Sequence, residues 1–392
     1  MPYRHFVQND KNFNLKKNLT IGILGGGQLA RMSVFQAKRL GFDTAILEKE
    51  KNSPAGQLTH KEFIGWVNDT TPLKNFANVS DVITLENEFV DYRRIEFLEK
   101  LGKKVLPSSV TISLIQDKLI QKETLLKNNI PVPKFLPLNH KNEFANIQKE
   151  LKYTYILKSR KMGYDGYGNA VVKNPKDFEI AYDKLVHRHS KLLAEEFIDF
   201  KMELAVMVAR TKKEIKVYPV VQTIQKNNIC RTVIAPAQIS SRLRNEAMEI
   251  AIESVKAVKG YGIFGIEMFL TSKNNILVNE MAPRPHNSGH YTIEGCYTSQ
   301  FENHIRAVMN LPLGSVDMVQ PYAVMVNLLG KRNGPGIIQN YSAGLKNAQV
   351  HLHIYGKEQS RIGRKMGHIT VTGNNLKSIL NIANEAEKEI II

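Results

Sequence analysis

Residues 265–281 read GIEMFLTSKNNILVNEM, with Glu267 and Glu280 on either side of a short polar turn. Apolar residues before and after this turn predict a β-hairpin. With the turn centred between Lys273 and Asn274, antiparallel pairing places Glu267 directly opposite Glu280. An alternative is that a bulge or a different turn directs one of the two glutamates to solvent.

Two carboxylates that face each other on a hairpin suggest a cation between them, because like charges directly opposite destabilise the pairing. Carboxylate-only ligation suits a hard divalent ion, Mg²⁺, with phosphate oxygens completing its shell. We therefore predict that Glu267 and Glu280 are metal ligands.

The run that follows the hairpin, APRPHNSGH at 282–290, is rich in hydrogen-bonding side chains. Arg284 offers a planar fork that matches a small oxyanion. His286 can donate, accept or move protons near neutral pH. A solvated turn can have this composition, but its position beside the predicted metal pair favours a reaction centre.

Upstream, Lys158 ends a predicted strand and is followed by the glycine-rich stretch GYDGYGN at 163–169. Such a flap can lay backbone N–H groups over phosphates, with the lysine as a point charge at its base. The alternative is an ordinary hairpin tip. Further on, the acidic and apolar residues 195–198 can line a purine pocket and Glu203 can bind ribose hydroxyls, although either acid can also be a surface glutamate.

Near the N-terminus, Gly25, Gly27 and Ala30 fit the G-x-G-x-x-[GA] pattern between a predicted strand and a predicted helix. Glu48 follows the next strand, near the offset of a ribose-binding acid, so the pattern taken alone indicates a nicotinamide or flavin enzyme. Its physical content is narrower, because a helix N-terminus attracts any phosphate. A glycine turn needed only for close packing is the third interpretation.

The chain has 392 residues, which suits two or three domains. Strands and helices alternate up to about residue 115, so the expected fold class is α/β with a doubly wound parallel sheet. We predict a Rossmann-like domain over 1–115, an α+β domain over 116–319, and a small, mostly β domain over 320–392.

The formal net charge of +17 comes from lysines scattered along the chain, which indicates a solvated basic surface. A basic nucleic-acid-binding protein is a competing class, but no nucleic-acid module accompanies the charge. No apolar run is long enough to span a membrane, and residues 1–20 lack the apolar core of a signal peptide. The two cysteines fit free thiols in a reducing cytosol.

Taken in order, these segments resemble the ATP-grasp superfamily, and within it the 5-(carboxyamino)imidazole ribonucleotide synthetase family. The resemblance runs from about residue 20 to about residue 372. It is carried by the stretches 22–32, 163–169, 279–290 and YGKEQSRIGRKMGH at 355–368, of which the last two are the most specific. The related formate-dependent transformylase has Asp-Thr-Gly-Met where this chain has Asn287-Ser-Gly-His290, which favours the carboxylating family.

The resemblance implies an ATP-grasp fold in the central domain and a role for each matching residue. The residues implied for ATP are Lys118, Lys158, Gly163, Gly166, Gly168, Asn169, Glu195, Glu196, Phe197, Ile198, Glu203, Lys226, Asn279 and Glu280. The residues implied for aminoimidazole ribonucleotide are Gln28, Leu29, Glu86, Tyr164, Asp165, Lys357, Arg364 and Lys365. Bicarbonate is expected at Arg284, His286 and Asn287, and the catalytic set is Lys158, Tyr164, Asp165, Arg284, His286 and Asn287.

The activity implied is carboxylation of the exocyclic amine of aminoimidazole ribonucleotide, driven by ATP with Mg²⁺ and bicarbonate, in a cytoplasmic homodimer. Another ATP-grasp ligase, such as a formate-dependent one, is the first alternative, and a nicotinamide-dependent oxidoreductase is the second. The chain departs from the family at Tyr167, where a basic residue is usual, and at Asn87 and Phe89, where Phe and Asn are usual. The first departure puts one substrate or phosphate contact in question.

Overall fold

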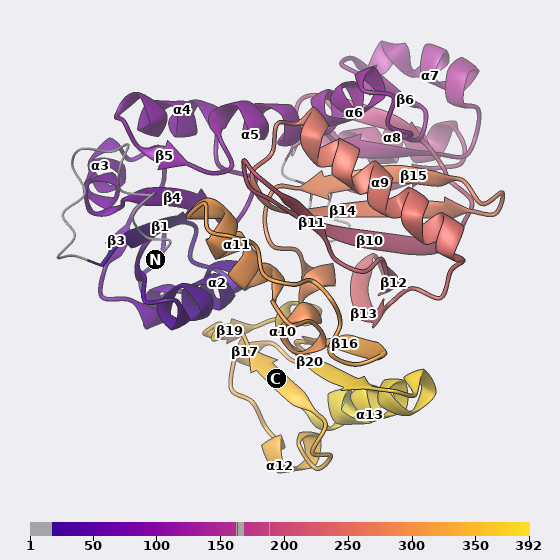
Figure 1. The fold of residues 1–392 in the computed structure, drawn as a ribbon. Coiled ribbons are helices and arrows are strands. Elements are labelled where there is room, and N and C mark those ends of the chain that lie inside the picture. The colour runs from indigo at the N-terminus through magenta and orange to yellow at the C-terminus, as the bar shows by residue number, and fades with distance from the viewer. Residues whose placement is uncertain (1–17, 162, 164–167, 188) are drawn as a thin grey trace.

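The structure is a computed structural model that describes residues 18–161, 163, 168–187 and 189–392. Its three larger sheets follow one another along the chain, and Figure 1 shows the N-terminal, central and C-terminal segments side by side. Among the described residues, no helix has both the length and the apolar character needed to cross a membrane.

The N-terminal sheet is fully parallel in the order β3-β2-β1-β4-β5. Strand β1 is buried along its whole length, as expected for the central strand of a sheet covered on both faces. The elements are β1 (Thr20–Leu24), α2 (Gln28–Arg39), β2 (Asp43–Glu48), η1 (Gly56–Leu58), β3 (Glu62–Ile64), α3 (Thr70–Val79), β4 (Val82–Leu85), α4 (Tyr92–Lys100), β5 (Lys104–Val105) and α5 (Ser109–Ile115).

The next segment forms a four-stranded antiparallel sheet in the order β6-β9-β7-β8, with helices packed on it. Lys158 near the end of β7 pairs with Asn169 at the start of β8, so residues 160–168 connect these two strands. The elements are α6 (Lys118–Lys127), β6 (Phe135–Leu138), η2 (Lys141–Glu143), α7 (Phe144–Leu151), β7 (Tyr155–Ser159), β8 (Asn169–Val172), α8 (Pro175–Val186) and β9 (Leu192–Glu196).

A nine-stranded sheet forms the rest of the central segment and continues into the C-terminal one. The central elements are β10 (Phe200–Arg210), β11 (Ile215–Val217), β12 (Val221–Lys226), β13 (Ile229–Ala235), α9 (Ser241–Ala257), β14 (Gly262–Thr271), β15 (Ile276–Ala282), η3 (Asn287–Gly289), α10 (Thr292–Gly295) and α11 (Gln300–Val308). The C-terminal elements are β16 (Tyr322–Leu329), β17 (Gly334–Pro335), α12 (Tyr341–Gly344), β18 (His351–Ile354), β19 (Gln359–Ser360), β20 (Lys365–Gly373) and α13 (Leu376–Glu389).

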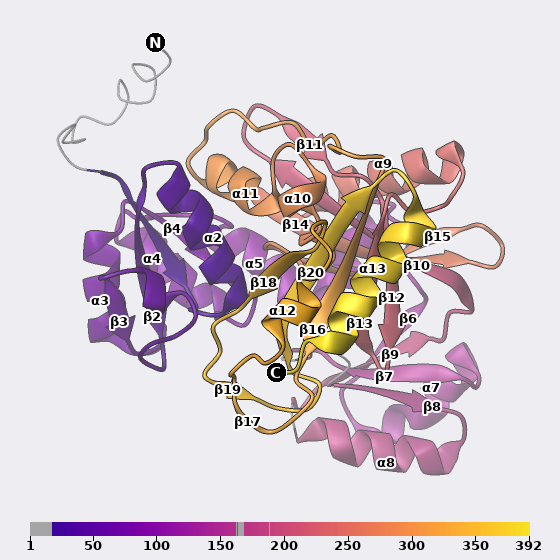
Figure 2. The same cartoon turned by 90° about the horizontal axis from the view of Figure 1, so that it is seen from below.

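The C-terminal strands extend the central sheet, because β13 pairs with β16, β16 with β20, and β20 with β18. Helix α13 packs its apolar face on β16 and β20 and is seen over them in Figure 2. The predicted fold class is confirmed. The sequence analysis, however, predicted neither this 14-residue helix nor the continuity of the sheet.

Helix α11 connects the central segment to the N-terminal one. Ile305 and Val308 on this helix belong to the same buried cluster as Ile21 and Val34 of the N-terminal sheet and helix α2. Figure 1 shows α11 lying between the N-terminal strands and the central sheet. The N-terminal sheet is thereby placed against the segment that carries residues 284–290.

Candidate active site

The β14–β15 hairpin places Glu267 opposite Glu280, as predicted, but by a different register near the turn. Met268 pairs with Val278, so the turn is centred on Lys273 and not between Lys273 and Asn274. A bulge between Glu267 and Met268 then inserts Asn279 as an extra residue and brings Glu280 opposite Glu267. The bulge that was considered an obstacle to the pairing is therefore what creates it.

The two carboxylates have different surroundings. Lys118 forms an ion pair with Glu280, and the His286 Nε2 atom lies 3.4 Å from the Glu267 Oε1 atom. Burial, together with the charges of Glu280 and Glu203, raises the pKa of Glu267 to about 7. A carboxylate that is this costly to ionise is a good candidate for a cation ligand, since a divalent ion would offset the repulsion.

A buried cluster of charges lies beside the bulge. The Lys158 Nζ atom donates to the Glu195 Oε1 atom at 2.6 Å and to the Asn279 Oδ1 atom at 3.1 Å. Lys122 lies 2.6 Å from the other oxygen of Glu195. Burial alone would raise the pKa of Glu195, but Lys122 and Lys158 together hold it below its usual value. Lys158, Glu195 and Asn279 are thus brought together as predicted, and Lys122 is an addition.

Arg284 and His286 lie near Glu267 and Glu280. The Arg284 guanidinium binds both oxygens of Glu88, at 2.6 Å and 3.0 Å, so the run after the hairpin is held against the loop after β4. Gln300 accepts from the backbone N–H of His286 at 2.9 Å and donates to its carbonyl at 2.7 Å. The His286 ring therefore projects from a backbone that is fixed on both sides, with its Nδ1 atom 3.0 Å from the Ser288 hydroxyl.

Asn287 is held by a buried partner. Its side-chain amide exchanges two hydrogen bonds with Asn327 of β16, at 2.9 Å and 2.7 Å. The Asn327 side-chain nitrogen also donates to the carbonyl of Cys230. This second hydrogen bond identifies the nitrogen and the oxygen of the Asn327 amide. The C-terminal segment thereby sets the orientation of a residue predicted to bind bicarbonate.

The first glycine loop is occupied by the protein's own carboxylates. Glu86 accepts hydrogen bonds from the backbone N–H groups of Gly27 at 2.8 Å and Leu29 at 3.2 Å, and Glu48 accepts from Gly26 at 2.8 Å. A dinucleotide pyrophosphate would need these same groups. This arrangement argues against the nicotinamide alternative. It places Leu29 and Glu86 together, with Gln28 partly exposed beside them.

The basic residues of the C-terminal segment reach the site from the other side. The Lys357 Nζ atom donates to the Lys365 carbonyl at 2.7 Å. The charge of Lys365 opposes, without cancelling, the burial and the carboxylates that raise the pKa of Glu267. Arg364 donates to the carbonyl of Gln359 at 2.6 Å and lies within electrostatic range of Glu50. Lys365 therefore lies within electrostatic range of Glu267, and Arg364 lies within electrostatic range of the N-terminal segment.

The remaining residues predicted for ATP lie around the ends of β8, β9, β10 and β12. Strand β9 ends at Glu196, so Phe197 and Ile198 follow it as a loop, with Phe197 46% exposed. Burial raises the pKa of Glu203 to about 7, and Lys226 is exposed at the end of β12. Gly163, Gly168 and Asn169 border the glycine-rich stretch, while the predicted residues Tyr164, Asp165 and Gly166, and the departure from the family at Tyr167, lie outside the described residues.

The sequence analysis missed three residues of this site, namely Lys122, Gln300 and Asn327, and it missed the ion-pair role of Glu88. Lys118 and Lys122 lie one helical turn apart, which places both on one helix face. That spacing was the only available signal for Lys122. Gln300 and Asn327 act through contacts with residues distant in the chain, for which no local pattern exists.

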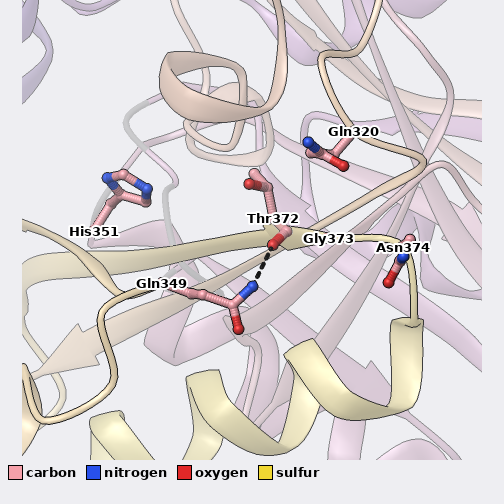
Figure 3. Close-up of a pocket in the computed structure, with 6 residues that line it drawn as sticks. All are labelled: Gln320, Gln349, His351, Thr372, Gly373 and Asn374. Carbon is pink, nitrogen blue, oxygen red and sulfur yellow. Dashed lines mark hydrogen bonds between the residues drawn. The ribbon is translucent and has the colours of Figure 1, made fainter.

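A surface pocket near the C-terminus is separate from this site. Figure 3 shows it lined by Gln320, Gln349, His351, Thr372, Gly373 and Asn374, with the Gln349 amide donating to the Thr372 carbonyl at 3.5 Å. It contains none of the residues predicted for catalysis or binding.

Comparison with known proteins defines the class first. The ATP-grasp domain family matches residues 123–301, preceded by a ribonucleotide synthetase preATP-grasp domain at 18–116. A phosphoribosylaminoimidazole carboxylase C-terminal domain matches residues 323–381. The chain thus belongs to the ATP-grasp class of ribonucleotide synthetases.

Individual relatives narrow this class. The chain is 39% identical to the N5-carboxyaminoimidazole ribonucleotide synthase of Bacillus subtilis over 89% of this chain and 90% of that one. The crystal structure of the Aspergillus clavatus N5-carboxyaminoimidazole synthase with ADP and 5-aminoimidazole ribonucleotide is similar with a TM-score of 0.86, at 36% identity over 95% of this chain and 99% of that one. The chain belongs to the N5-carboxyaminoimidazole ribonucleotide synthetase family.

Longer relatives also match. The phosphoribosylaminoimidazole carboxylase of Vigna aconitifolia is 40% identical over 92% of this chain, which covers 65% of that protein. The chain therefore spans about two thirds of the length of these carboxylases.

Proposed function

We propose that the protein carboxylates the exocyclic amine of 5-aminoimidazole ribonucleotide, using ATP and bicarbonate and releasing ADP and phosphate. The observation that carries this proposal is the facing pair Glu267 and Glu280, which lies between the lysines of an ATP-grasp domain and the Arg284–Asn287 run. The related proteins of similar length bear the synthase name, so we propose this step and not the whole activity of the longer carboxylases.

The donor set fits Mg²⁺. Glu267 and Glu280 supply hard carboxylate oxygens, and a cation between them would offset the burial and the neighbouring carboxylates that raise the pKa of Glu267. When bound there with nucleotide, the ion would draw charge from the transferring phosphoryl group. Lys158 would supply further positive charge to the phosphates, and Asn279 would lie beside them.

The chemistry follows from the weakness of bicarbonate as an electrophile. A bicarbonate oxygen attacks the γ-phosphorus of ATP, the bond to the β-phosphate oxygen breaks, and ADP and carboxyphosphate form. The exocyclic amine then attacks the carboxyl carbon, or CO₂ released from it, and phosphate leaves. The amine proton passes to His286 or to phosphate.

The residues after the hairpin position these reactants. The part of the Arg284 guanidinium group that does not contact Glu88 would bind the oxyanion, from a backbone fixed between two prolines, and Asn287 offers an amide whose orientation Asn327 determines. The glycine-rich flap, including Gly163 and Gly168, would exclude water from the short-lived intermediate. Glu86, Lys357, Arg364 and Lys365 would contact the ribonucleotide.

The direct test is release of phosphate from ATP that depends on both bicarbonate and aminoimidazole ribonucleotide. Labelled bicarbonate should appear in an acid-labile carbamate on the ribonucleotide. Phosphate release that requires formate in place of bicarbonate would assign the site to a different ATP-grasp ligase.

Three wider features complete the proposal. We propose a homodimer in the cytoplasm, with domains at 1–115, 116–319 and 320–392, because the family resemblance covers all three segments. Light scattering on the purified protein measures the oligomeric state. A monomer at the concentration of the activity assay would contradict the dimer but not the reaction.

A further inference from the structure

Helix α6 places a second, fully buried ammonium group beneath the site. Lys122 is 2% exposed, one helical turn after Lys118, and none of the steps above uses it. A lysine is almost never buried to this extent without anionic partners, because the desolvation of its charge is costly. Its contacts therefore indicate what it does.

Lys122 and Lys158 contact the same two residues. The Lys122 Nζ atom lies 2.6 Å from one oxygen of Glu195 and donates to the Asn279 backbone carbonyl at 3.1 Å. Lys158 takes the other oxygen of Glu195 and the side-chain oxygen of Asn279. The four groups form a closed ring with two positive charges and one negative charge.

This ring has a consequence for nucleotide binding. Lys158, at the base of the glycine-rich flap, is the lysine that would move onto the phosphates, and that movement would take it from Glu195. Glu195 is 1% exposed, and a buried carboxylate that loses its only cation is strongly destabilised. With Lys122 in place, Glu195 keeps one ammonium group after Lys158 has left.

The same helix face also fixes the bulge that carries Glu280. Gln121 accepts from the Met281 backbone N–H and donates to the Met281 carbonyl, both at 3.0 Å. Lys118 forms an ion pair with Glu280, and Lys122 binds the carbonyl of Asn279. Three successive residues of β15, 279 to 281, are thus held by one helix.

We propose that Lys122 is a positioning residue for the nucleotide. It remains on Glu195 and on the Asn279 carbonyl, so that Lys158 can transfer from Glu195 to the phosphates without leaving a buried charge unpaired or displacing Glu280. This inference rests on the proposed nucleotide role of the site, but not on the identity of the carboxylated substrate.

The test compares a single and a double variant by calorimetric binding of Mg·ADP, without bicarbonate or ribonucleotide. Lys122→Met should weaken binding by about 10-fold or more, since Glu195 then resists the departure of Lys158. The double variant Lys122→Met/Glu195→Gln should recover most of that loss, because no carboxylate remains to be neutralised. Lys127→Met, at the exposed end of the same helix, is the matched control and should bind as the unchanged protein does.

Two outcomes would overturn the inference, namely unchanged binding by Lys122→Met, or a double variant no better than Lys122→Met. If Lys122 only stabilised the fold, the double variant would bind no better than Lys122→Met.

If Lys122→Met does not fold, a crystal structure of the unchanged protein with Mg²⁺ and a non-hydrolysable ATP analogue decides. It should show Lys158 on the phosphates and Lys122 still on Glu195, whereas Lys122 on a phosphate would refute the proposal. Failure of the unchanged protein to bind Mg·ADP would instead contradict the proposed function.

Discussion

Glu280 is surrounded by charges of both signs, with Glu267 opposite it and Lys118 paired to it. Glu280→Gln keeps the shape but removes a metal ligand, so we expect the rate of ATP cleavage to fall by at least ~10²-fold. The thermal midpoint should change little, because the side chain is 36% exposed. Coupled ADP release and a thermal melt measure the two effects. A variant that turns over normally would show that the metal assignment is wrong.

Glu267 makes the metal requirement depend on pH. Its pKa is raised to about 7, so the carboxyl is protonated below pH 7 and ionised above it. Protons therefore compete with Mg²⁺ only on the acid side, and the half-saturating Mg²⁺ concentration should rise ~10-fold for each pH unit below 7. Magnesium titrations of ATP cleavage at pH 6, 7 and 8 test this.

Glu203 provides the control for that titration, because burial raises its pKa to about 7 as well. In Glu203→Gln the half-saturating Mg²⁺ concentration should still depend on pH, but the dependence should move slightly to lower pH, since Glu203 contributes to the raised pKa of Glu267. A pH dependence that disappears in this variant would assign the effect to Glu203.

Arg284 has a bidentate partner in Glu88 and is expected to bind bicarbonate with the remaining face of its guanidinium group. Arg284→Lys keeps the charge but loses the fork, so the KM for bicarbonate should rise ~10-fold or more while the KM for ATP stays within about twofold. Initial rates with each substrate varied in turn measure this split. Equal changes in both constants would remove Arg284 from the bicarbonate site.

At the scale of elements, strand β14 approaches the run after the hairpin so closely that only glycine fits at residue 265. A Cβ atom there would lie 2.5 Å from the Cβ atom of His286. Gly265→Ala should therefore push His286 away, raise the KM for bicarbonate, and lower the free energy of unfolding by about 1–3 kcal/mol.

Gly41→Ala is the control that separates the effect of Gly265→Ala on stability from its effect on the KM for bicarbonate. Gly41 has a φ of +81° in a turn, and a Cβ atom there would meet nothing within 4 Å. The substitution costs ~1 kcal/mol of stability through the left-handed backbone alone. Denaturant unfolding and bicarbonate kinetics on both variants should show a stability loss in each and a kinetic defect only in Gly265→Ala.

The elements also show what the sequence could predict. The facing glutamates were predictable because a hairpin brings together residues 13 apart, and one bulge changed the register without changing the pair. The contact of Lys122 with Glu195 was not predictable, since it depends on how α6 packs against two sheets. The same holds for Asn287 and Asn327, which meet only because β16 joins the central sheet.

At the scale of the molecule, the N-terminal segment contacts the central and C-terminal segments through several separate links. The Arg39 side chain pairs with Glu302 of α11 at 2.9 Å, Glu88 binds Arg284, and Asn52 donates to Glu358 at 2.7 Å. The residues predicted to bind the ribonucleotide lie on both sides of these links. A ribonucleotide bound by these residues would therefore contact both the N-terminal and the C-terminal segment.

The continuity of the large sheet decides whether the C-terminal segment is a separable unit. Residues 232–235 of β13 pair with residues 323–326 of β16, and Asn327 holds Asn287. A fragment of residues 1–319 would expose β13 as a long apolar edge, which favours aggregation. We expect this fragment to aggregate or to lose its cooperative thermal transition, and co-expression of residues 320–392 should restore a single peak in size-exclusion chromatography. A monodisperse fragment that melts cooperatively and binds Mg·ADP would show that the strands of residues 320–392 add to a sheet already stable without them.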